Sequence, residues 1–208
     1  MIELLTANTP NGKKITIMLE EINFEYKVTK ININENEQFR PEFIKLSPFR
    51  KIPVIIDHAN NETLFESGAI LIYLGLKSGK FYKKHERMII NQWLMGQMAY
   101  VGPMLGQHHQ FHHYNPGKSK FGEDRYFKIS EKIYNELDER LSSSKYLANN
   151  NYTIADIATF PWIARHEWHD IGLKKFKNLA RWYNEIANRE AVIKGYDLLK
   201  KGEKIPLV

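Results

Sequence analysis

Residues 51–77 read KIPVIIDHANNETLFESGAILIYLGLK, and this stretch indicates the fold more strongly than any other. Pro53–Asp57 is apolar and rich in β-branched residues, which predicts a strand that starts at a proline, where no ladder hydrogen bond is lost. Asn60-Asn61 suits a hairpin turn because asparagine tolerates a positive φ, and residues 63–65 would form the returning strand. Ser67–Lys77 then has the composition of a helix with a serine at its start. A hairpin that leads directly into a helix favours an α/β domain.

The sequence before this stretch extends the α/β pattern towards the N-terminus. Ile2–Leu5 is a short apolar run that predicts a buried strand, and Thr9-Pro10-Asn11-Gly12 ends it. Apolar residues at helical spacing follow, so we expect a helix over 10–22. Alternating residues predict a second strand over 24–33, and 41–46 can form a short helix. Residues 1–80 therefore form one predicted domain.

The sequence from residue 85 onward has helical periodicity and no convincing strand. We expect helices over 87–101, 121–141, 153–169, 178–188 and 190–200, which together form an all-helical second domain over 85–208. One helix start is unusually clear, because Thr153 is followed three residues later by Asp156, the pattern of a capping box. Tyr152, just before the cap, can pack on Ile157. The expected fold class is an α/β domain followed by an all-α domain.

Composition excludes several classes of function. The 208 residues include no cysteine, which excludes structural disulfides, thiolate metal sites and catalysis by a thiol of the protein itself. The net charge is +6, but the lysines are scattered and no nucleic-acid-binding motif is present, so we expect no nucleic-acid partner. No segment is long and apolar enough to span a membrane, and the N-terminus has no signal-peptide pattern. We therefore expect a soluble cytoplasmic protein without a membrane partner.

Three short motifs in the first domain are candidates for a binding site. Thr9 and Asn11 flank the start of the first helix, where free amides attract an anion, although a purely structural cap is the alternative. Ile52 precedes the proline at the start of a strand, where its backbone could pair with an extended peptide if the bond is cis. Glu66 and Ser67 lie at a strand-to-helix turn and could accept an ammonium group and hold a carboxylate. Together the motifs predict a cleft for a small peptide with a charged end.

The combination of these motifs with the capping box resembles the glutathione transferase superfamily over essentially the whole chain. TPNGKKITIMLEE, QFRPEF, SPFRKIPVIIDH, LFESGAILIYL, GPMLGQHHQFHH and YTIADIATFPW are similar to the bacterial Nu class of glutathione-dependent disulfide-bond oxidoreductases. The resemblance implies an N-terminal thioredoxin-like domain, a helical C-terminal domain and a homodimer. It implies an enzyme that uses glutathione as cosubstrate to exchange small or protein disulfides. Two other functions stay open: conjugation of glutathione to electrophiles, and a non-catalytic interaction module.

The resemblance also implies roles for individual residues. Thr9 and Asn11 match the catalytic pair beside the glutathione sulfur, while the matched glutathione contacts are Gln38, Ile52, Glu66, Ser67 and Arg125. No tyrosine, serine or cysteine occupies the first-helix position that other classes use to ionise the thiol. Because the protein has no cysteine, glutathione itself would supply the reacting sulfur.

A cluster of histidines is the strongest metal-like feature in the sequence. His108, His109, His112 and His113 place two i, i+4 pairs on a helix, a spacing that can bind zinc. No cysteine or nearby aspartate completes a ligand set. We therefore expect no metal cofactor and interpret the cluster as polar lining of the cleft between the two predicted domains.

Overall fold

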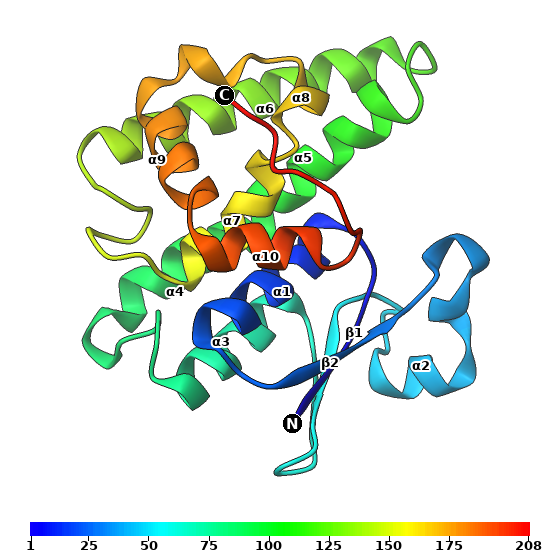
Figure 1. Cartoon of the computed structure of the whole chain (residues 1–208). Helices are drawn as coiled ribbons and strands as arrows, with labels where there is room; N and C mark the ends of the chain where they lie inside the picture. Colours follow the sequence, from blue (N-terminus) through cyan, green and yellow to red (C-terminus); the bar gives the residue numbers. More distant parts are fainter. The chain divides into compact units, whose positions relative to one another are not determined.

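The structure is a computed structural model that describes all 208 residues. It divides into two units, one made of Met1–Tyr82 with Arg189–Lys204 and the other made of Lys83–Asn188 with Ile205–Val208. The first unit is α/β and the second is helical (Figure 1). The expected thioredoxin-like domain followed by a helical domain is confirmed.

The first unit has a four-stranded sheet in the order β2-β1-β3-β4. Strand β1 is parallel to β2 and antiparallel to β3, and β3 is antiparallel to β4, with Leu4 opposite both Val28 and Ile55. Its elements are β1 (Ile2–Thr6), α1 (Pro10–Ile22), β2 (Tyr26–Lys30), α2 (Pro41–Leu46), β3 (Val54–Asp57), β4 (Glu62–Phe65), α3 (Ser67–Ser78) and α10 (Glu190–Asp197), with short helical turns at Ile33–Glu35 (η1) and Glu37–Phe39 (η2).

Helices cover both faces of this sheet. Leu5 and Val54 pack on Phe43 of α2, on one face. Their strand neighbours Leu4 and Ile55 are fully buried and point to the other face, because successive side chains in a strand alternate. Helices α1 and α3 pack together on that face, as Figure 1 shows. Buried side chains on both faces fix the position of the sheet. The candidate site lies at one end of its strands.

Helix α10 packs along α1 and so belongs to the first unit. The sequence-based division placed residues 189–204 with the helical domain, whereas the contacts group them with the sheet. Gly195 explains the close approach, because a Cβ atom there would lie 2.6 Å from the Cα atom of Ile17. Thr16 donates a hydrogen bond from Oγ1 to the Gly195 carbonyl at 2.7 Å, and Arg189 pairs with Glu21.

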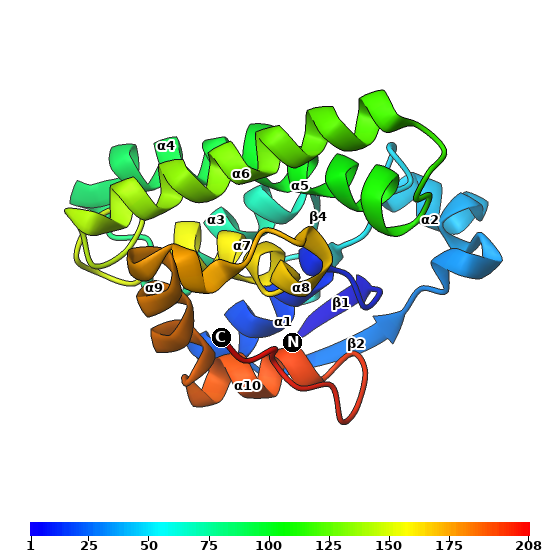
Figure 2. The same ribbon diagram turned by 90° about the horizontal axis from the view of Figure 1, so that it is seen from above.

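The second unit is built from helices alone. Figure 2 shows the long helix α6 running beside α5. Its elements are a turn at Lys84–Glu86 (η3), α4 (Arg87–Gly96), η4 (Gln97–Val101), α5 (Gly102–His108), η5 (His109–His113), α6 (Lys120–Ser142), α7 (Ile154–Ile163), α8 (His166–His169), η6 (Leu173–Lys175) and α9 (Lys177–Ala187). The expected capping box is present at the start of α7. The Thr153 side chain accepts from the Asp156 backbone, and the Asp156 side chain accepts from the Thr153 backbone. No helix is both long and apolar enough to cross a membrane.

Two expected helices differ in the structure. The helix expected over 87–101 widens into a π-type turn at 97–101, closed by a hydrogen bond from the Gly102 amide to the Gln97 carbonyl. Pro103 follows, and its missing N–H and bulky ring disfavour the normal α pattern there. The helix expected over 153–169 ends at Ile163, because the Arg165 amide bonds the Trp162 carbonyl in a tight turn before α8 begins.

Candidate functional site

The register of the sheet brings the three sequence motifs to one end of the sheet. Strand β1 ends at Thr6, next to the start of β3 at Val54, which pairs with Phe65 at the end of β4. The same end of the sheet therefore carries the segment before α1, the Ile52–Pro53 peptide bond and the turn before α3. The structure thus gathers three motifs that are up to 58 residues apart between Thr9 and Ser67.

The start of α1 presents hydrogen-bond donors at this end of the sheet. Thr9 is the N-cap residue, and its Oγ1 accepts a hydrogen bond from the Gly12 amide at 3.1 Å. Since the oxygen accepts from the helix, the hydroxyl proton is available to a further acceptor. Gly12 has no room for a side chain, because a Cβ atom would lie 2.3 Å from the Ala7 carbonyl oxygen. Asn11, in the first turn, adds an amide close to the positive end of the helix dipole.

The second motif has the backbone geometry that the sequence left open. The Ile52–Pro53 peptide bond is cis. Ladder pairing of β3 starts only at Val54, so the backbone of Ile52 lies outside the sheet ladder. Ser47 fixes the preceding residue from both sides: its hydroxyl donates to the Lys51 carbonyl at 2.8 Å and accepts from the Lys51 amide at 3.1 Å. The half-buried Ile52 therefore lies on a well-supported loop.

The third motif combines an exposed carboxylate with a helix start. Glu66 has φ 69° and ψ 114°, a conformation that non-glycine residues adopt at a cost of about 1–3 kcal/mol. Its carbonyl accepts the Ile70 amide at 2.9 Å, which begins α3, and its side chain is exposed. Ser67 is the first residue of α3 and is only 5% exposed. Such a helix start attracts an anion, while the carboxylate of Glu66 attracts a cation.

A buried lysine connects the first motif to the third. Lys14 on α1 is 1% exposed and donates a hydrogen bond from Nζ to Ser67 Oγ at 3.3 Å. Burial lowers the pKa of Lys14 to about 7, and the negative charge of Glu66 offsets part of this effect. The sequence analysis did not identify Lys14. Its position four residues before the buried Met18, on the same helix face, was the available signal.

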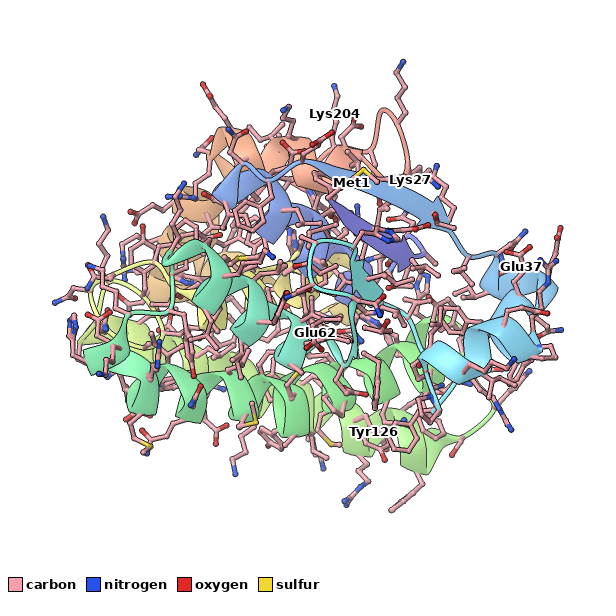
Figure 3. The ribbon with its side chains drawn as sticks, turned by 90° about the horizontal axis from the view of Figure 1, so that it is seen from below. Met1, Lys27, Glu37, Glu62, Tyr126 and Lys204 are labelled. Atoms are coloured by element: carbon pink, nitrogen blue, oxygen red, sulfur yellow. The ribbon has the colours of Figure 1, made fainter.

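The two remaining predicted residues lie on different units. Gln38 is on η2, the short helical segment marked by Glu37 in Figure 3. Its Nε2 donates to the Ile33 carbonyl at 3.4 Å, whereas its Oε1 is buried without a hydrogen-bond partner, so it can accept from a ligand N–H. Arg125 is an exposed residue of α6, next to Tyr126, and its guanidinium lies 6.0 Å from the Tyr126 ring. The role of Arg125 therefore stays a prediction.

Two members of the histidine cluster, His108 and His109, join His169 in a hydrogen-bonded network inside the helical unit. The Nε2 atoms of His109 and His169 are 2.7 Å apart, and Tyr134 Oη lies 2.7 Å from His169 Nδ1. His108 Nε2 lies 3.0 Å from the His169 carbonyl and can donate to it. Burial, followed by the charge of Arg165, lowers the pKa of His109 to about 3. No group of three or more potential metal ligands is present. Burial also lowers the pKa of His108 and of His169, so the three buried histidines favour the neutral form and serve as internal hydrogen-bonding groups.

Fold and site together define a class: a thioredoxin-like domain with two helix starts at one end of its sheet, followed by a helical domain. The family model "Glutathione S-transferase, N-terminal domain" matches residues 2–75, and "Glutathione S-transferase, C-terminal domain" matches 103–190. The disulfide-bond oxidoreductase YfcG of Escherichia coli is 42% identical over 96% of this chain and 95% of its own. The chain belongs to the glutathione S-transferase family.

Solved structures of relatives contain glutathione. A glutathione transferase from Burkholderia graminis, with two glutathione molecules bound per subunit, is 37% identical and superimposes with a TM-score of 0.90, covering 97% of this chain and 89% of that one. A glutathione transferase from Pseudomonas putida, with one glutathione disulfide bound per subunit, is 38% identical with a TM-score of 0.88, covering 95% and 91%.

Proposed function

We propose that this protein is a glutathione-dependent disulfide-bond oxidoreductase in which the thiol of bound glutathione is the reacting sulfur. The observation that carries the proposal is that the motifs of Thr9, Ile52 and Ser67 lie at one end of the sheet, in a chain without cysteine. The relatives named as disulfide-bond oxidoreductases, YfcG and YghU of Escherichia coli, support the same reaction.

The three motifs suit different parts of glutathione. The α-carboxylate of the γ-glutamyl end binds at Ser67 and the α3 amides, and its ammonium group binds Glu66. The cysteinyl backbone pairs with Ile52, which places its sulfur beside Thr9 and Asn11. Gln38 accepts from a peptide N–H through its unpartnered Oε1. Arg125, on the helical unit, is the predicted contact of a glutathione carboxylate.

Thiol–disulfide exchange requires a thiolate held in line with the disulfide that it attacks. The Thr9 hydroxyl, the Asn11 amide and the α1 dipole stabilise the thiolate relative to the thiol, and each pKa unit is worth about 1.4 kcal/mol. The thiolate attacks one sulfur of the substrate, a mixed disulfide forms, and the other sulfur leaves as a thiolate that takes a proton from water. A second glutathione thiolate attacks the mixed disulfide and releases glutathione disulfide and the second substrate thiol. The two electrons come from two glutathione molecules.

Turnover of bis-hydroxyethyl disulfide by single variants tests this proposal. Asn11→Ala removes a donor to the developing thiolate and should lower kcat about ten- to a hundredfold. Thr9→Ala should do less, because water can replace a capping hydroxyl. Ser67→Ala is the matched control at the far end of the ligand, and it should raise KM with little effect on kcat.

The relative rates of two reactions separate the open alternatives. Disulfide reduction should exceed conjugation to chlorodinitrobenzene in kcat/KM, because the donors at the start of α1 can hold the leaving thiolate as well as the attacking one, and no tyrosine, serine or cysteine occupies the first-helix position that other classes use to ionise the thiol. Faster conjugation would favour a conjugating transferase. Bound glutathione without either activity would favour an interaction module.

We further propose that the protein belongs to the Nu class, works in the cytoplasm and forms a homodimer. Light scattering should give twice the chain mass of 24.5 kDa at micromolar concentration. A mass of one chain would contradict the dimer and leave the disulfide chemistry untouched.

A further inference from the structure

The segment that follows α10 returns to the start of α1, the helix whose N-cap is Thr9. The Glu203 amide donates to the Lys200 carbonyl at 3.0 Å, which closes a turn in this segment. Leu199 is 5% exposed, and its Cδ1 atom would lie 3.3 Å from a Cβ atom added to Gly12 in α1. The segment up to Lys204, labelled in Figure 3, belongs to the same unit as α1. The C-terminal segment is therefore part of the surroundings of the α1 start.

A buried lysine of α1 fixes the position of the Glu203 carboxylate. Lys13 is 0% exposed, and its Nζ donates to Glu203 Oε2 at 2.9 Å. The same Nζ donates to the Tyr196 carbonyl at 2.6 Å and lies 3.5 Å from the centroid of the Tyr196 ring. Separating a buried ion pair is costly, because each charge would lose its compensation. The carboxylate of Glu203 is thus held at a defined place beside α1.

The oxygen that accepts from Lys13 also accepts from the loop before the helix. Asn8 Nδ2 donates to Glu203 Oε2 at 2.9 Å, across 195 positions of sequence. Asn8 is half-buried and directly precedes Thr9, whose amide donates to the Ala7 carbonyl at 2.8 Å. A hydrogen bond to a carboxylate is stronger than one between neutral groups. Through Asn8, the carboxylate of Glu203 therefore restrains the backbone that carries the Thr9 hydroxyl.

We propose that Glu203 is a positioning residue for disulfide exchange, which acts through Asn8 to hold the donors at the start of α1 in place for the glutathione thiolate. The inference rests on the proposed function, because it requires the reacting sulfur beside Thr9 and Asn11. Donors stabilise developing charge only when they are held in the productive geometry, and a displacement of about 1 Å can cost about a hundredfold in rate. The pair of Lys13 and Glu203 supplies a rigid support for that geometry from outside the ligand site.

Steady-state kinetics of the full-length protein with glutathione and bis-hydroxyethyl disulfide tests this role. Glu203→Ala should lower kcat about tenfold, because the loop becomes free to shift by a fraction of an ångström. The KM for glutathione should change little, since Ile52, Glu66 and Ser67 bind other parts of the ligand. A loss of kcat with KM maintained is the result expected of a group that acts on the reacting sulfur.

The ultraviolet absorbance of the glutathione thiolate in the complex at pH 7 separates positioning from charge. Removal of a carboxylate near the sulfur would by itself favour the thiolate, so a purely electrostatic role predicts a higher thiolate absorbance in Glu203→Ala. Displaced donors stabilise the thiolate less, so the positioning role predicts a lower absorbance. The two explanations therefore differ in the sign of the change.

A double-mutant cycle tests the route through Asn8. Asn8→Ala should reproduce the loss of kcat while leaving the ion pair of Lys13 and Glu203 intact, and it keeps the inference testable if Glu203→Ala does not fold. Adding Glu203→Ala to Asn8→Ala should lower kcat by no more than about a further twofold, because both residues act through one hydrogen bond.

Arg189→Met is the matched control for packing of α10 on α1. Arg189 Nη2 donates to Glu21 Oε2 at 2.8 Å, an ion pair between the same two helices in the last turn of α1. Its removal should leave kcat unchanged. A loss of kcat in Arg189→Met equal to that in Glu203→Ala would overturn the inference, since it would reflect general loosening of the two helices.

The other outcomes distinguish the inference from the function beneath it. An unchanged kcat in Glu203→Ala or in Asn8→Ala, with an active wild type, overturns the role of Glu203 and leaves the proposed function standing. Additive losses in the double variant, or a higher thiolate absorbance in Glu203→Ala, overturn it in the same way. A wild type that binds glutathione but reduces no disulfide overturns the proposed function and the inference together.

Discussion

Replacement of Asp57 by asparagine should destabilise the protein in a pH-dependent way. Asp57 ends β3 with a buried carboxylate that accepts from Tyr73 Oη at 2.6 Å, from the Ala59 amide at 3.0 Å and from Lys77 Nζ. These contacts connect the β3–β4 hairpin to α3, whose first residue is Ser67. Burial alone would raise the pKa of Asp57, but the three hydrogen bonds and the Lys77 charge together lower the pKa to about 2.

The magnitude follows from linkage. A carboxyl with a pKa of 3.8 in the unfolded chain and about 2 in the folded protein contributes about 2 kcal/mol at neutral pH. The folded pKa is the lower one, so this contribution is complete above about pH 5 and is lost between about pH 4 and pH 2. Asp57→Asn has no carboxylate and lacks this dependence. The difference in unfolding free energy between wild type and variant should therefore shrink by about half at pH 3.

Urea denaturation at pH 7, 5, 4 and 3, followed by tryptophan fluorescence, measures this difference directly. Other carboxylates titrate in the same range, but they are common to both proteins and cancel in the comparison. Lys77→Met, which removes the partner charge, should reduce the same pH dependence in part. A wild-type-to-variant difference that stays constant from pH 7 to pH 3 would refute the assignment of the low pKa to Asp57.

Three other outcomes are expected. Asp156→Ala should lower the unfolding free energy by about 3–5 kcal/mol in urea, because it leaves the Leu147 and Thr153 amides and the Trp182 indole without their buried acceptor; a loss below about 1 kcal/mol would contradict this. Gly195→Ala should cost about 1–3 kcal/mol in thermal unfolding, since its Cβ would meet the α1 backbone; an unchanged Tm would show that α10 adjusts. Dialysis against EDTA should leave disulfide turnover intact, and loss that zinc restores would assign a metal role to the histidines.

Local signals made much of the fold predictable from the sequence. The Thr153–Asp156 capping box and the Thr9 cap appear in the structure as expected, because each depends on residues within one helical turn. The hairpin over residues 53–65 was predictable for the same reason. Long-range packing was not: Gly195 allows α10 to lie against α1, and no local pattern in residues 190–200 indicates that partner. The π-type turn at 97–101 also left no clear pattern in the hydrophobic spacing.

The same distinction between local signals and long-range packing applies to the residues of the candidate site. Thr9, Asn11, Glu66 and Ser67 stand beside helix starts, which sequence can identify, and the sheet register that unites them follows from the order of the strands. Lys14 was not identified from the sequence because a lysine on a helix is usually exposed, whereas here α3 and α10 both pack on α1 and Lys14 is buried. The positive φ of Glu66 and the unpartnered Oε1 of Gln38 likewise leave no pattern in the sequence.

Electrostatics explains why a protein without cysteine can suit thiol chemistry. Two helix starts, at Thr9 and at Ser67, direct backbone amides to one end of the sheet, and Lys14 Nζ donates a hydrogen bond to Ser67. All three favour negative charge, whereas Glu66 adds one negative group beside the second helix start. Glutathione matches this arrangement, since it has a carboxylate and an ammonium group at one end and a sulfur that reacts as an anion. Under the proposed function the protein needs no nucleophile of its own, because the same field would bind the peptide and stabilise its thiolate.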